Sequence, residues 1–565
     1  MFKKILQNTP NQVWLLLLGI FFFIPFLGQV RLFDWDKINF AESAREMMLT
    51  GDYLTVQIDF KPFWEKPPLF FWLQVLAMKT FGQTEFAARF PSAIVGILTL
   101  QVVYAIGQKL HDKAFGFLWA LAFLGSLTPH LYFKTGIIDP TFNLLIFIGL
   151  YSAIKAFESS FATKFVLLSG LFIGLATLTK GPVAILIWGL TFLTFGFFYQ
   201  RKPTIQKSDS DEKISNEIAA KIQLNTLLKP LIIFGFTVLA VASVWFGLEY
   251  TRHGWWFFEQ FFAYQIRLFT TPDAGHEQPF YYHFIVILLG CFPASIFATS
   301  LLFSTKNNQS FGTTIAQKNM LLLMQCLFWV VMILFSIVRT KIVHYSSMAW
   351  FPVTYLATVQ VYSLIKQEII WNKWLKISLL VIGILIGIVL AAIPLIGMYA
   401  FEVAPYIKDQ FVAGNLQTPV TWVGWEWSLG LILVLLIIVF VWRQKIIGLY
   451  VSMASVLFLY LALIVPRVEP YIQGAAIDFY RSFEDQDVYV YPLGFKSYAN
   501  LYYFNKQKPK NSKSYDENWL LNGLVDKPTY FVAKNTELDN YRNNANLQFI
   551  KEENGFVFFR RKPRF

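Results

Sequence analysis

The sequence is poor in cysteine and in charge. Its 565 residues include two cysteines and 15% charged residues. Cys291 and Cys326 lie in apolar runs and lack the spacing of metal ligands or of a redox pair, so we interpret both as small packed residues. With 56% hydrophobic residues, the chain is too apolar for an ordinary soluble protein. We predict an integral membrane protein that crosses the membrane many times.

The net charge of +13 does not indicate nucleic-acid binding. The basic residues gather in short loops between apolar segments, where they orient a membrane protein and meet anionic headgroups. We therefore expect a membrane partner and no nucleic acid. The N-terminus begins like a signal peptide, but its apolar stretch is too long and no small-residue cleavage site follows it, which favours a retained first span.

Thirteen apolar runs are long enough to cross about 30 Å of hydrocarbon as helices. They lie near 12–30, 90–109, 114–132, 140–157, 164–178, 183–199, 228–249, 281–303, 319–337, 346–365, 374–398, 427–442 and 446–465. We predict a mainly α, polytopic transmembrane bundle of about thirteen spans, formed by residues 1–465.

Lysines and arginines predict the side on which each loop lies. If Lys3 and Lys4 are cytoplasmic, alternate loops on that side carry cations, as the positive-inside rule requires. The polar segment 201–227 is then a cytoplasmic connector. An odd number of spans puts residues 466–565 outside, where "DVYVYPL", "PTYFVAK" and "GFVFF" predict strands and "KSYANLYYF" predicts a helix. We expect a small C-terminal extracytoplasmic α/β domain.

The first outer loop, residues 31–89, carries charge that membrane topology does not require. Charged residues there (Asp36, Glu42, Arg45 and Glu46) have helical spacing, and apolar ones (Phe40, Met47 and Met48) can face the membrane. This pattern predicts an amphipathic helix at the interface. A second interfacial helix should begin at Pro67 or Pro68, because proline suits the first helical turn.

The outer loops also contain the residue types that are needed to transfer a group from a lipid phosphate to an acceptor. A phosphate leaving group requires fixed positive charge and hydrogen-bond donors, here Lys66, Arg267, Lys341 and Tyr345. An acceptor hydroxyl or amine requires a carboxylate, here Asp36 or Asp139. Structural alternatives exist for several of these residues: helix capping by the two aspartates, an interfacial ion pair of Glu65 with Lys66, and helix-surface pairing of Arg45 with Glu42 and Glu46.

An ordered set of motifs resembles the polytopic GT-C glycosyltransferases. Between residue 30 and about residue 360 it contains "DKINFAESAREMMLTGDYL", "FWEKPPLFFWL", "GQTEFAARFPSAIVG", "IIDP", "LTKGPVA", "IRLF" and "RTKIVHYSSMAWFP". The chain is most similar to the lipid A aminoarabinose transferase family, which is related to protein O-mannosyltransferases. Such enzymes use polyprenyl-phosphate sugars as donors, act on the periplasmic or lumenal face and invert the anomeric carbon.

The resemblance implies a role for each matching residue. Asp36 and Asp139 match two family aspartates, and Glu65 with Lys66 matches an acidic-basic pair whose lysine meets the donor phosphate. Further matches are Lys180 in the "TKGP" element, Arg267 and Tyr345 as phosphate ligands, and Lys341 with His344 in a lysine-histidine element. Glu42, Arg45 and Asn39 are candidate supporting residues. Asn39 stands where the family commonly has arginine, and Ala263 and Tyr264 stand where it has Glu-His. These departures leave open the sugar and a divalent metal.

We predict an inner-membrane, inverting glycosyltransferase with its active site on the periplasmic face and a lipid A, glycan or protein acceptor. A glycolipid flippase or transporter is the alternative. Transporters place polar groups near the middle of the membrane in two repeated halves. Here the distinctive charged residues lie at the ends of spans on one side, and neither "EKPP" nor "TKGP" recurs. A receptor or assembly protein has only the C-terminal domain in its favour.

Overall fold

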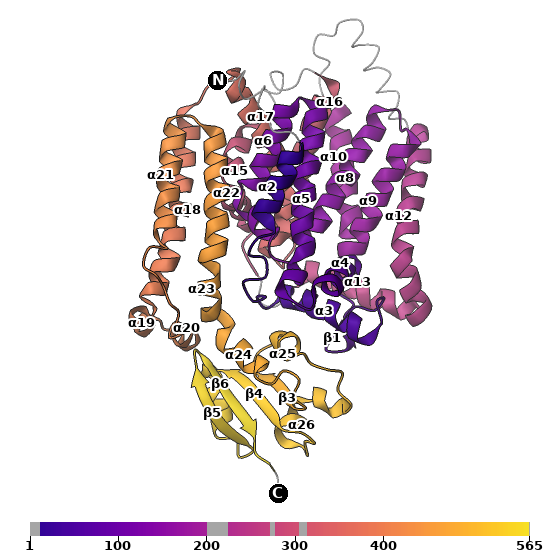
Figure 1. The fold of residues 1–565 in the computed structure, drawn as a ribbon. Helices are drawn as coiled ribbons and strands as arrows, with labels where there is room; N and C mark the ends of the chain where they lie inside the picture. The colour runs from indigo at the N-terminus through magenta and orange to yellow at the C-terminus, as the bar shows by residue number, and fades with distance from the viewer. Residues whose placement is uncertain (1–11, 201–223, 272–276, 304–313, 564–565) are drawn as a thin grey trace, which may run out of the picture.

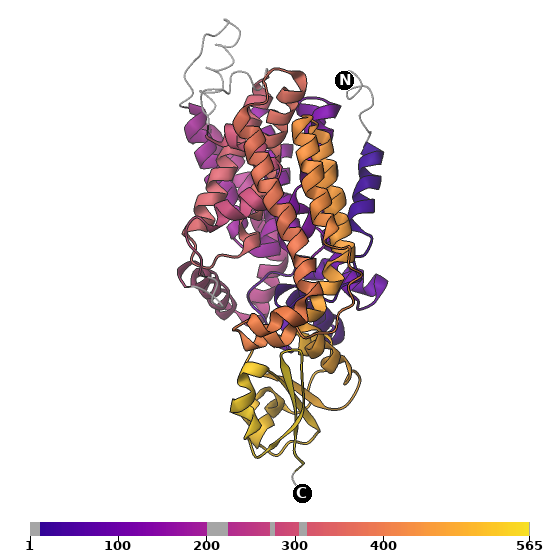
Figure 2. The ribbon, with the colours of Figure 1, turned by 90° about the vertical axis from the view of Figure 1, so that its left-hand side faces the viewer.

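The computed structural model describes residues 12–200, 224–271, 277–303 and 314–563. Lys3, Lys4 and most of the predicted connector 201–227 lie outside these residues. Long helices stand side by side in a bundle, and a small sheet lies at one end of it (Figures 1 and 2). Helix α2 (Gln12–Phe23) begins at the end of the bundle away from the sheet.

Nine helical segments in the described residues are long and apolar enough to cross a membrane. They are α5 (Glu85–Leu110), α8 (Asp139–Glu158), α9 (Thr163–Lys180), α10 (Val183–Gln200), most of α12 (Leu224–His253), α16 (Ile315–Ile337), η2 with α17 (Val343–Ala349 and Trp350–Lys366), α18 (Lys373–Met398) and α22 (Ile446–Leu463). Each of the four other predicted runs contains a shorter apolar helix, and in three of them this helix covers only part of the run: α2 (Gln12–Phe23), α6 (Lys113–Leu124), α15 (Ala294–Phe303) and α21 (Ser428–Trp442). The mainly helical bundle is confirmed, and the number of thirteen crossings stays a prediction.

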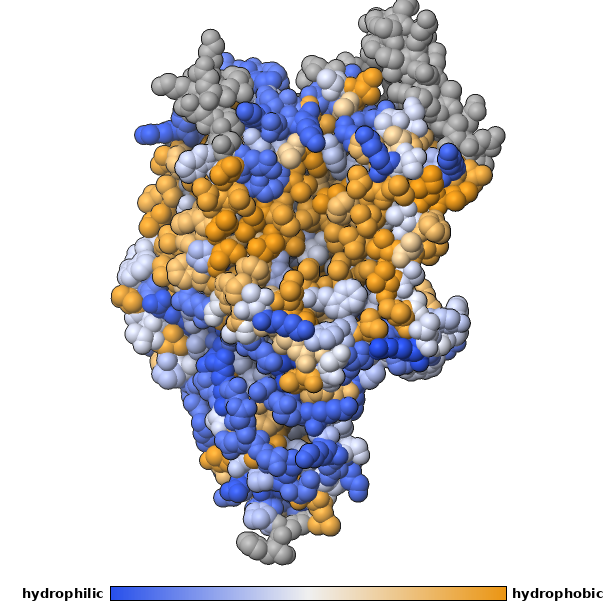
Figure 3. Space-filling model, turned by 45° about the vertical axis from the view of Figure 1, so that its right-hand side comes forward, coloured by the Kyte–Doolittle hydropathy of each residue, from blue (hydrophilic) through white to orange (hydrophobic). Residues whose placement is uncertain are grey.

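On the face drawn in Figure 3, a hydrophobic band crosses the bundle between two hydrophilic ends. Large apolar side chains on α10 and α12 are widely exposed, among them Leu193 at 72% and Phe236 at 73%. Contiguous apolar surface of this kind is unfavourable in water and suits the hydrocarbon of a membrane.

The first outer loop folds into two helices and a short hairpin. These are α3 (Asp36–Thr50), β1 (Gln57–Ile58), β2 (Lys61–Pro62) and α4 (Leu69–Phe81). Helix α4 begins directly after Pro68, as predicted. Helix α3 differs from the expectation of a membrane-facing helix: Phe40 packs on Phe71, and Glu42 is fully buried. The reason is that the C-terminal segment covers the charged side of α3.

Within the described residues, six further short helices lie between the long ones in the sequence. They are α7 (Leu127–Tyr132), α13 (Trp255–Thr270), α14 (Tyr282–Gly290), α19 (Ala400–Val403), η3 (Ala404–Tyr406) and α20 (Gln410–Asn415). Next to the sheet lie α23 (Val465–Glu469), η4 (Pro470–Gly474), α24 (Ala475–Arg481), α25 (Ala499–Tyr502), η5 (Ser512–Tyr515), α26 (Glu517–Asn522), η6 (Asn535–Glu537) and α27 (Leu538–Arg542).

The predicted C-terminal α/β unit contains a four-stranded sheet in the order β3-β4-β6-β5. Its strands are β3 (Tyr489–Leu493), β4 (Thr529–Lys534), β5 (Leu547–Glu553) and β6 (Phe556–Arg561). β3 and β4 are parallel, and the other pairs are antiparallel. Asn554 and Gly555 both have positive φ, as a two-residue hairpin turn requires. Strand β5 was not predicted, because only Leu547 of this edge strand is buried and the apolar alternation is weak.

One apolar cluster joins the first outer loop to the C-terminal unit. Leu32 and Phe70 from the loop share it with Tyr480 and Phe558, and all four are at most 1% exposed. Such burial contributes about 1.5–3 kcal/mol for each large apolar side chain. The sheet unit is therefore packed against the loop that holds half of the predicted site residues.

Candidate active site

A cavity of about 630 Å³ lies where the outer loops meet the C-terminal unit. Nine of the twelve predicted site residues line it: Asp36, Asn39, Glu65, Lys66, Asp139, Lys180, Arg267, His344 and Tyr345. They come from α3, the segment before α4, the start of α8, the end of α9, α13 and η2. Residues far apart in the sequence thus surround one volume.

Helices α8 and α9 bring an aspartate and a lysine together. Asp139 begins α8 and Lys180 ends α9, so each charge has the sign that its helix end stabilises. Lys180 Nζ donates to Asp139 Oδ1 at 2.5 Å, and both side chains are largely buried. The N-cap residues of α3 and α8 are Trp35 and Ile138, and neither aspartate occupies a cap position. The capping alternative is therefore wrong for both aspartates.

His344 connects the two aspartates. Its Nε2 lies 3.8 Å from Asp36 Oδ2 and 3.8 Å from Asp139 Oδ2. A protonated imidazole there would neutralise part of two carboxylates that face the same cavity. Asp36 has a side chain that is 30% exposed, whereas that of Asp139 is 3% exposed. Asp36 is thus the aspartate that a bound molecule reaches more easily.

Two cations share one aromatic ring on the other side of the cavity. Lys66 Nζ lies 5.2 Å from the centre of the Tyr264 ring, and Arg267 Cζ lies 5.0 Å from it. Tyr264 is one of the departures from the family pattern, and its ring holds the two cations through cation-π contact. Burial lowers the pKa of Lys66 below its usual range, and the nearby Glu65 offsets only part of this effect. An anionic ligand would therefore stabilise the charged form of Lys66.

Two predicted supporting residues face the cavity without a described side-chain partner. Within the described residues, no cation lies within 4.0 Å of the Glu65 carboxylate, although its backbone oxygen accepts a hydrogen bond from Gln265 Nε2 at 3.3 Å. Asn39 is 3% exposed, and among these residues its Oδ1 has no hydrogen-bond partner. A buried acceptor of this kind is costly unless a ligand satisfies it.

Three predicted residues do not line the cavity. Lys341 is buried beside it, between lining residues Thr340 and Ile342. Glu42 and Arg45 form a buried pair at 2.6 Å, and Arg45 also donates to Asn505 Oδ1 and to the Lys506 carbonyl. The alternative of surface pairing on α3 is wrong, because the C-terminal segment buries this pair. The functional roles of these three residues stay predictions.

Several lining residues were not predicted. Asp34, Trp35 and Lys37 surround Asp36, and their position in the loop was the available signal. Lys496 and Tyr498 come from the C-terminal unit, where nothing in the sequence connects them with the outer loops. The ammonium of Lys496 lies 4.7 Å from the Trp35 ring. The C-terminal unit therefore forms part of the cavity wall.

The described residues contain no group of three or more histidine, cysteine, aspartate and glutamate side chains that could hold a metal ion. Lys180 already bonds one oxygen of Asp139. The divalent metal left open by the sequence thus has no three-ligand protein site in this part of the chain.

Known proteins resemble this chain in sequence over part of its length. The dolichyl-phosphate-mannose-protein mannosyltransferase family matches residues 65–208. An undecaprenyl phosphate-alpha-4-amino-4-deoxy-L-arabinose arabinosyl transferase from Proteus mirabilis is 25% identical over 51% of this chain and 49% of its own length. One from Photorhabdus laumondii is 22% identical over 74% of this chain and 70% of its own. The chain thus spans about half the length of the Proteus relative that it matches.

A solved structure matches nearly the whole fold. The structure of ArnT from Cupriavidus metallidurans bound to undecaprenyl phosphate covers 98% of this chain and 99% of its own, with a TM-score of 0.71 and 15% sequence identity. At this identity the match shows the fold. Together with the sequence matches, it confirms the predicted resemblance to GT-C glycosyltransferases of the aminoarabinose transferase and protein mannosyltransferase group.

Proposed function

We propose that this chain, similar in sequence and fold to GT-C glycosyltransferases, is an inverting glycosyltransferase that moves a sugar from a polyprenyl-phosphate donor to a lipid, glycan or protein acceptor. One observation carries the proposal: a single cavity is lined by cations and by carboxylates, namely Lys66, Lys180, Arg267, Asp36 and Asp139. Cations stabilise a phosphate leaving group, and a carboxylate activates an acceptor.

In this proposal Lys66 and Arg267 bind the donor phosphate, and the Tyr345 hydroxyl donates a hydrogen bond to it. Asp36, the more exposed aspartate, takes the proton of the attacking hydroxyl or amine. His344 keeps Asp36 next to Asp139, whose charge Lys180 balances. The acceptor then attacks the anomeric carbon from the face opposite the phosphate, and the bond between the sugar and the phosphate oxygen breaks. Polyprenyl phosphate leaves with the negative charge that the cations stabilise.

We infer that the cavity faces the periplasm from an inner membrane. The positive-inside rule supports this side, because Lys3 and Lys4 precede α2 in the sequence, and α2 begins at the end of the bundle opposite the C-terminal sheet (Figure 2). The cavity does not support the flippase alternative. Its charged residues lie at the ends of spans on one side of the bundle, whereas a transporter places polar groups near the middle of the membrane in two repeated halves.

We propose an aminopentose as the first donor sugar to test, because the relatives act on a 4-amino-4-deoxy-L-arabinose donor by name. The buried Asn39 Oδ1 supports a sugar with an amine or a hydroxyl, either of which can donate a hydrogen bond to it. A mannosyl donor belongs in the same comparison, because the matching family profile is named for mannose transfer.

The test is transfer by purified protein from radiolabelled undecaprenyl-phosphate aminoarabinose and polyprenyl-phosphate mannose to lipid A and to membrane extract. We expect Asp36→Asn and Lys66→Ala to lower turnover by about 100-fold or more, as loss of a charge-stabilising group does. Lys79→Ala is the matched control, since Lys79 also lies over a tyrosine ring, 4.5 Å from that of Tyr53, but outside the cavity. Full turnover in both site variants would refute the assignment, and lipid translocation without bond cleavage would favour the flippase.

A further inference from the structure

We propose that the C-terminal unit positions Asp36 through Gln473 and Tyr503, so that it is a working part of the active site. This inference rests on the proposed function. It concerns residues 31–35, which lead into α3 and contain neither helix nor strand. Apart from the Trp35 carbonyl, which accepts a hydrogen bond from the Asn39 amide at 3.0 Å, their backbone groups have no partners in regular secondary structure, so other groups must satisfy them.

Gln473 and Tyr503 provide these partners. Gln473 Nε2 donates to the Leu32 carbonyl at 2.8 Å, and Gln473 Oε1 accepts from the Asp34 amide at 3.2 Å. The Leu32 amide donates to the Tyr503 hydroxyl at 2.6 Å. A single glutamine side chain thus spans two residues of the segment that ends at Asp36. Gln473 is 8% exposed, so water does not readily replace these bonds.

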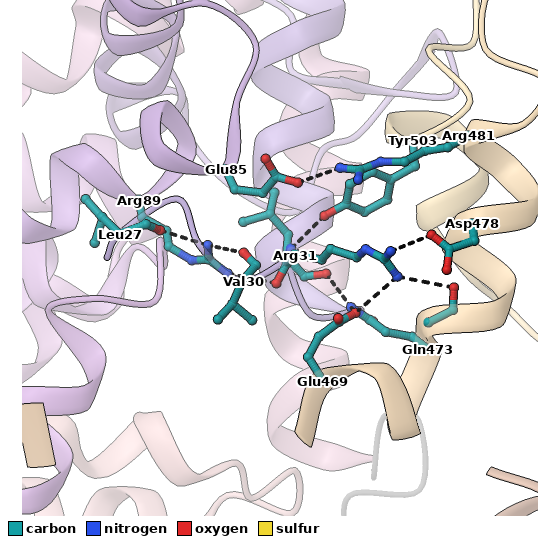
Figure 4. A network of polar contacts seen from close by, with 12 residues as sticks. Leu27, Val30, Arg31, Glu85, Arg89, Glu469, Gln473, Asp478, Arg481 and Tyr503 are labelled. Atoms are coloured by element: carbon teal, nitrogen blue, oxygen red, sulfur yellow. Dashed lines mark hydrogen bonds and ion pairs between the residues drawn. The ribbon is translucent and has the colours of Figure 1, made fainter. Parts of the chain in front are cut away.

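Charged contacts fix the same segment on either side (Figure 4). The Arg31 side chain donates to the Gly474 carbonyl at 3.2 Å and pairs with Asp478. Arg89 of α5 donates to the Leu27 carbonyl at 2.9 Å and to the Arg31 carbonyl at 2.8 Å. The bundle therefore holds the segment up to residue 31, and the C-terminal unit holds it from residue 31 onward.

The segment is also fastened at Asp34. The Ser497 hydroxyl donates to Asp34 Oδ2 at 2.5 Å, and the Tyr498 amide lies 3.3 Å from both carboxylate oxygens. Tyr498 and Asp34 both line the cavity. Two residues later Asp36 faces His344 at 3.8 Å. A shift of the segment would move Asp36 away from the acceptor, and misplacement by about 1 Å can cost on the order of 100-fold in rate.

This arrangement makes Gln473 and Tyr503 positioning residues rather than catalytic ones. Neither lines the cavity, and the cations assigned to the donor phosphate belong to other elements. Loss of their hydrogen bonds should therefore lower kcat and leave donor binding unchanged. A merely structural role would instead reduce the amount of folded protein and every activity equally.

The test uses the full chain with Gln473→Met and Tyr503→Phe, which keep side-chain volume and remove the hydrogen bonds. Tyr502→Phe is the matched control: it changes the neighbouring buried tyrosine, whose hydroxyl has no hydrogen-bond partner within the described residues. We expect each variant to lower kcat at least tenfold with a donor KM within twofold of wild type, and the control to behave as wild type. Undecaprenyl phosphate binding and the melting temperature are measured in parallel.

Wild-type kcat in both variants would overturn the inference. A loss shared by Tyr502→Phe, or a loss of kcat matched by a loss of folded protein or of undecaprenyl phosphate binding, would overturn it as well. Failure of the proposed function looks different, because the wild-type protein itself would then transfer no sugar.

Discussion

Asp139 is almost fully buried between Lys180 and His344. The contribution of its ion pair with Lys180 to stability can be tested by changing one residue. Lys180→Met leaves the Asp139 carboxylate without its 2.5 Å partner in a site where its side chain is 3% exposed. Removing one member of a buried ion pair typically costs about 3 kcal/mol or more. We expect a loss of this size in the free energy of unfolding, measured by denaturation in detergent.

Lys155→Met supplies the matched control for this change. Lys155 pairs with Glu158 at 2.7 Å near the far end of α8, the helix that Asp139 begins, but both side chains are more exposed, and such pairs contribute about 0.5 kcal/mol. The double variant Lys180→Met/Asp139→Asn should regain most of the stability, since no buried charge is left unpaired, but not the transfer activity. Equal stability losses in the Lys180 and Lys155 variants would contradict the proposed ion pair.

At the scale of residues, charge next to apolar runs made most of the charged residues of the cavity predictable. Lys66, Asp139 and Lys180 stand at the ends of helices that hydropathy locates, so both their side of the membrane and their chemical type can be inferred. Lys496 could not be inferred in this way. It reaches the cavity through packing of the C-terminal unit on the first loop, and local sequence contains no signal for a contact between such distant segments.

At the scale of elements, α3 supports the hairpin that leads to Lys66. Glu46 on α3 accepts hydrogen bonds from the backbone amides of Asp59 and Phe60 at 2.7 and 2.8 Å. Asp59 and Phe60 both have positive φ. This backbone conformation is unfavourable for residues other than glycine, so contacts such as these hydrogen bonds must stabilise it. Burial and the neighbouring Glu42 raise the pKa of Glu46 to about 9.

This pKa predicts a pH dependence of stability with a definite sign. Between the ordinary value of 4.5 and about 9, the folded chain holds a proton that the unfolded chain has released, so stability falls as the pH rises. We expect the wild-type melting temperature to decrease from pH 5 to pH 9, and Glu46→Gln to flatten this decrease. Asp52→Asn is the control, because hydrogen bonds lower the pKa of Asp52 despite partial burial and its effect belongs to acidic pH. An unchanged slope in Glu46→Gln would refute the assignment.

The helices themselves followed from hydropathy and proline position, whereas the burial of α3 did not. A helix with Glu42, Arg45 and Glu46 in its sequence is normally solvated on its charged side. Here Asn505 and the Lys506 carbonyl bond Arg45, so the charged side is covered by a partner whose own sequence shows no complementary pattern. Periodicity indicates which face of a helix is apolar, but not what covers the polar face.

At the scale of the whole molecule, the apolar cluster shared by the first loop and the C-terminal unit allows a test of whether residues 466–565 form a separate domain. A separate C-terminal domain would leave the first loop intact when removed, whereas the apolar cluster with Leu32, Phe70, Tyr480 and Phe558 predicts that the loop loses its fold. We expect the chain ending at residue 465 to retain its bundle, which has its own large core, and to lose transfer activity. Limited proteolysis in detergent should then cut within residues 31–66.

The control for this truncation keeps every contact and breaks only the chain. A protease site inserted at Leu524, which is 78% exposed and lies between α26 and β4, allows cleavage inside the C-terminal unit without removing it. Because loops at the surface tolerate cuts when packing on both sides persists, the cleaved protein should keep its activity and its protected first loop. An active, protease-resistant chain ending at residue 465 would instead make residues 466–565 an independent appendage, and would also remove the physical basis for positioning of Asp36 by Gln473.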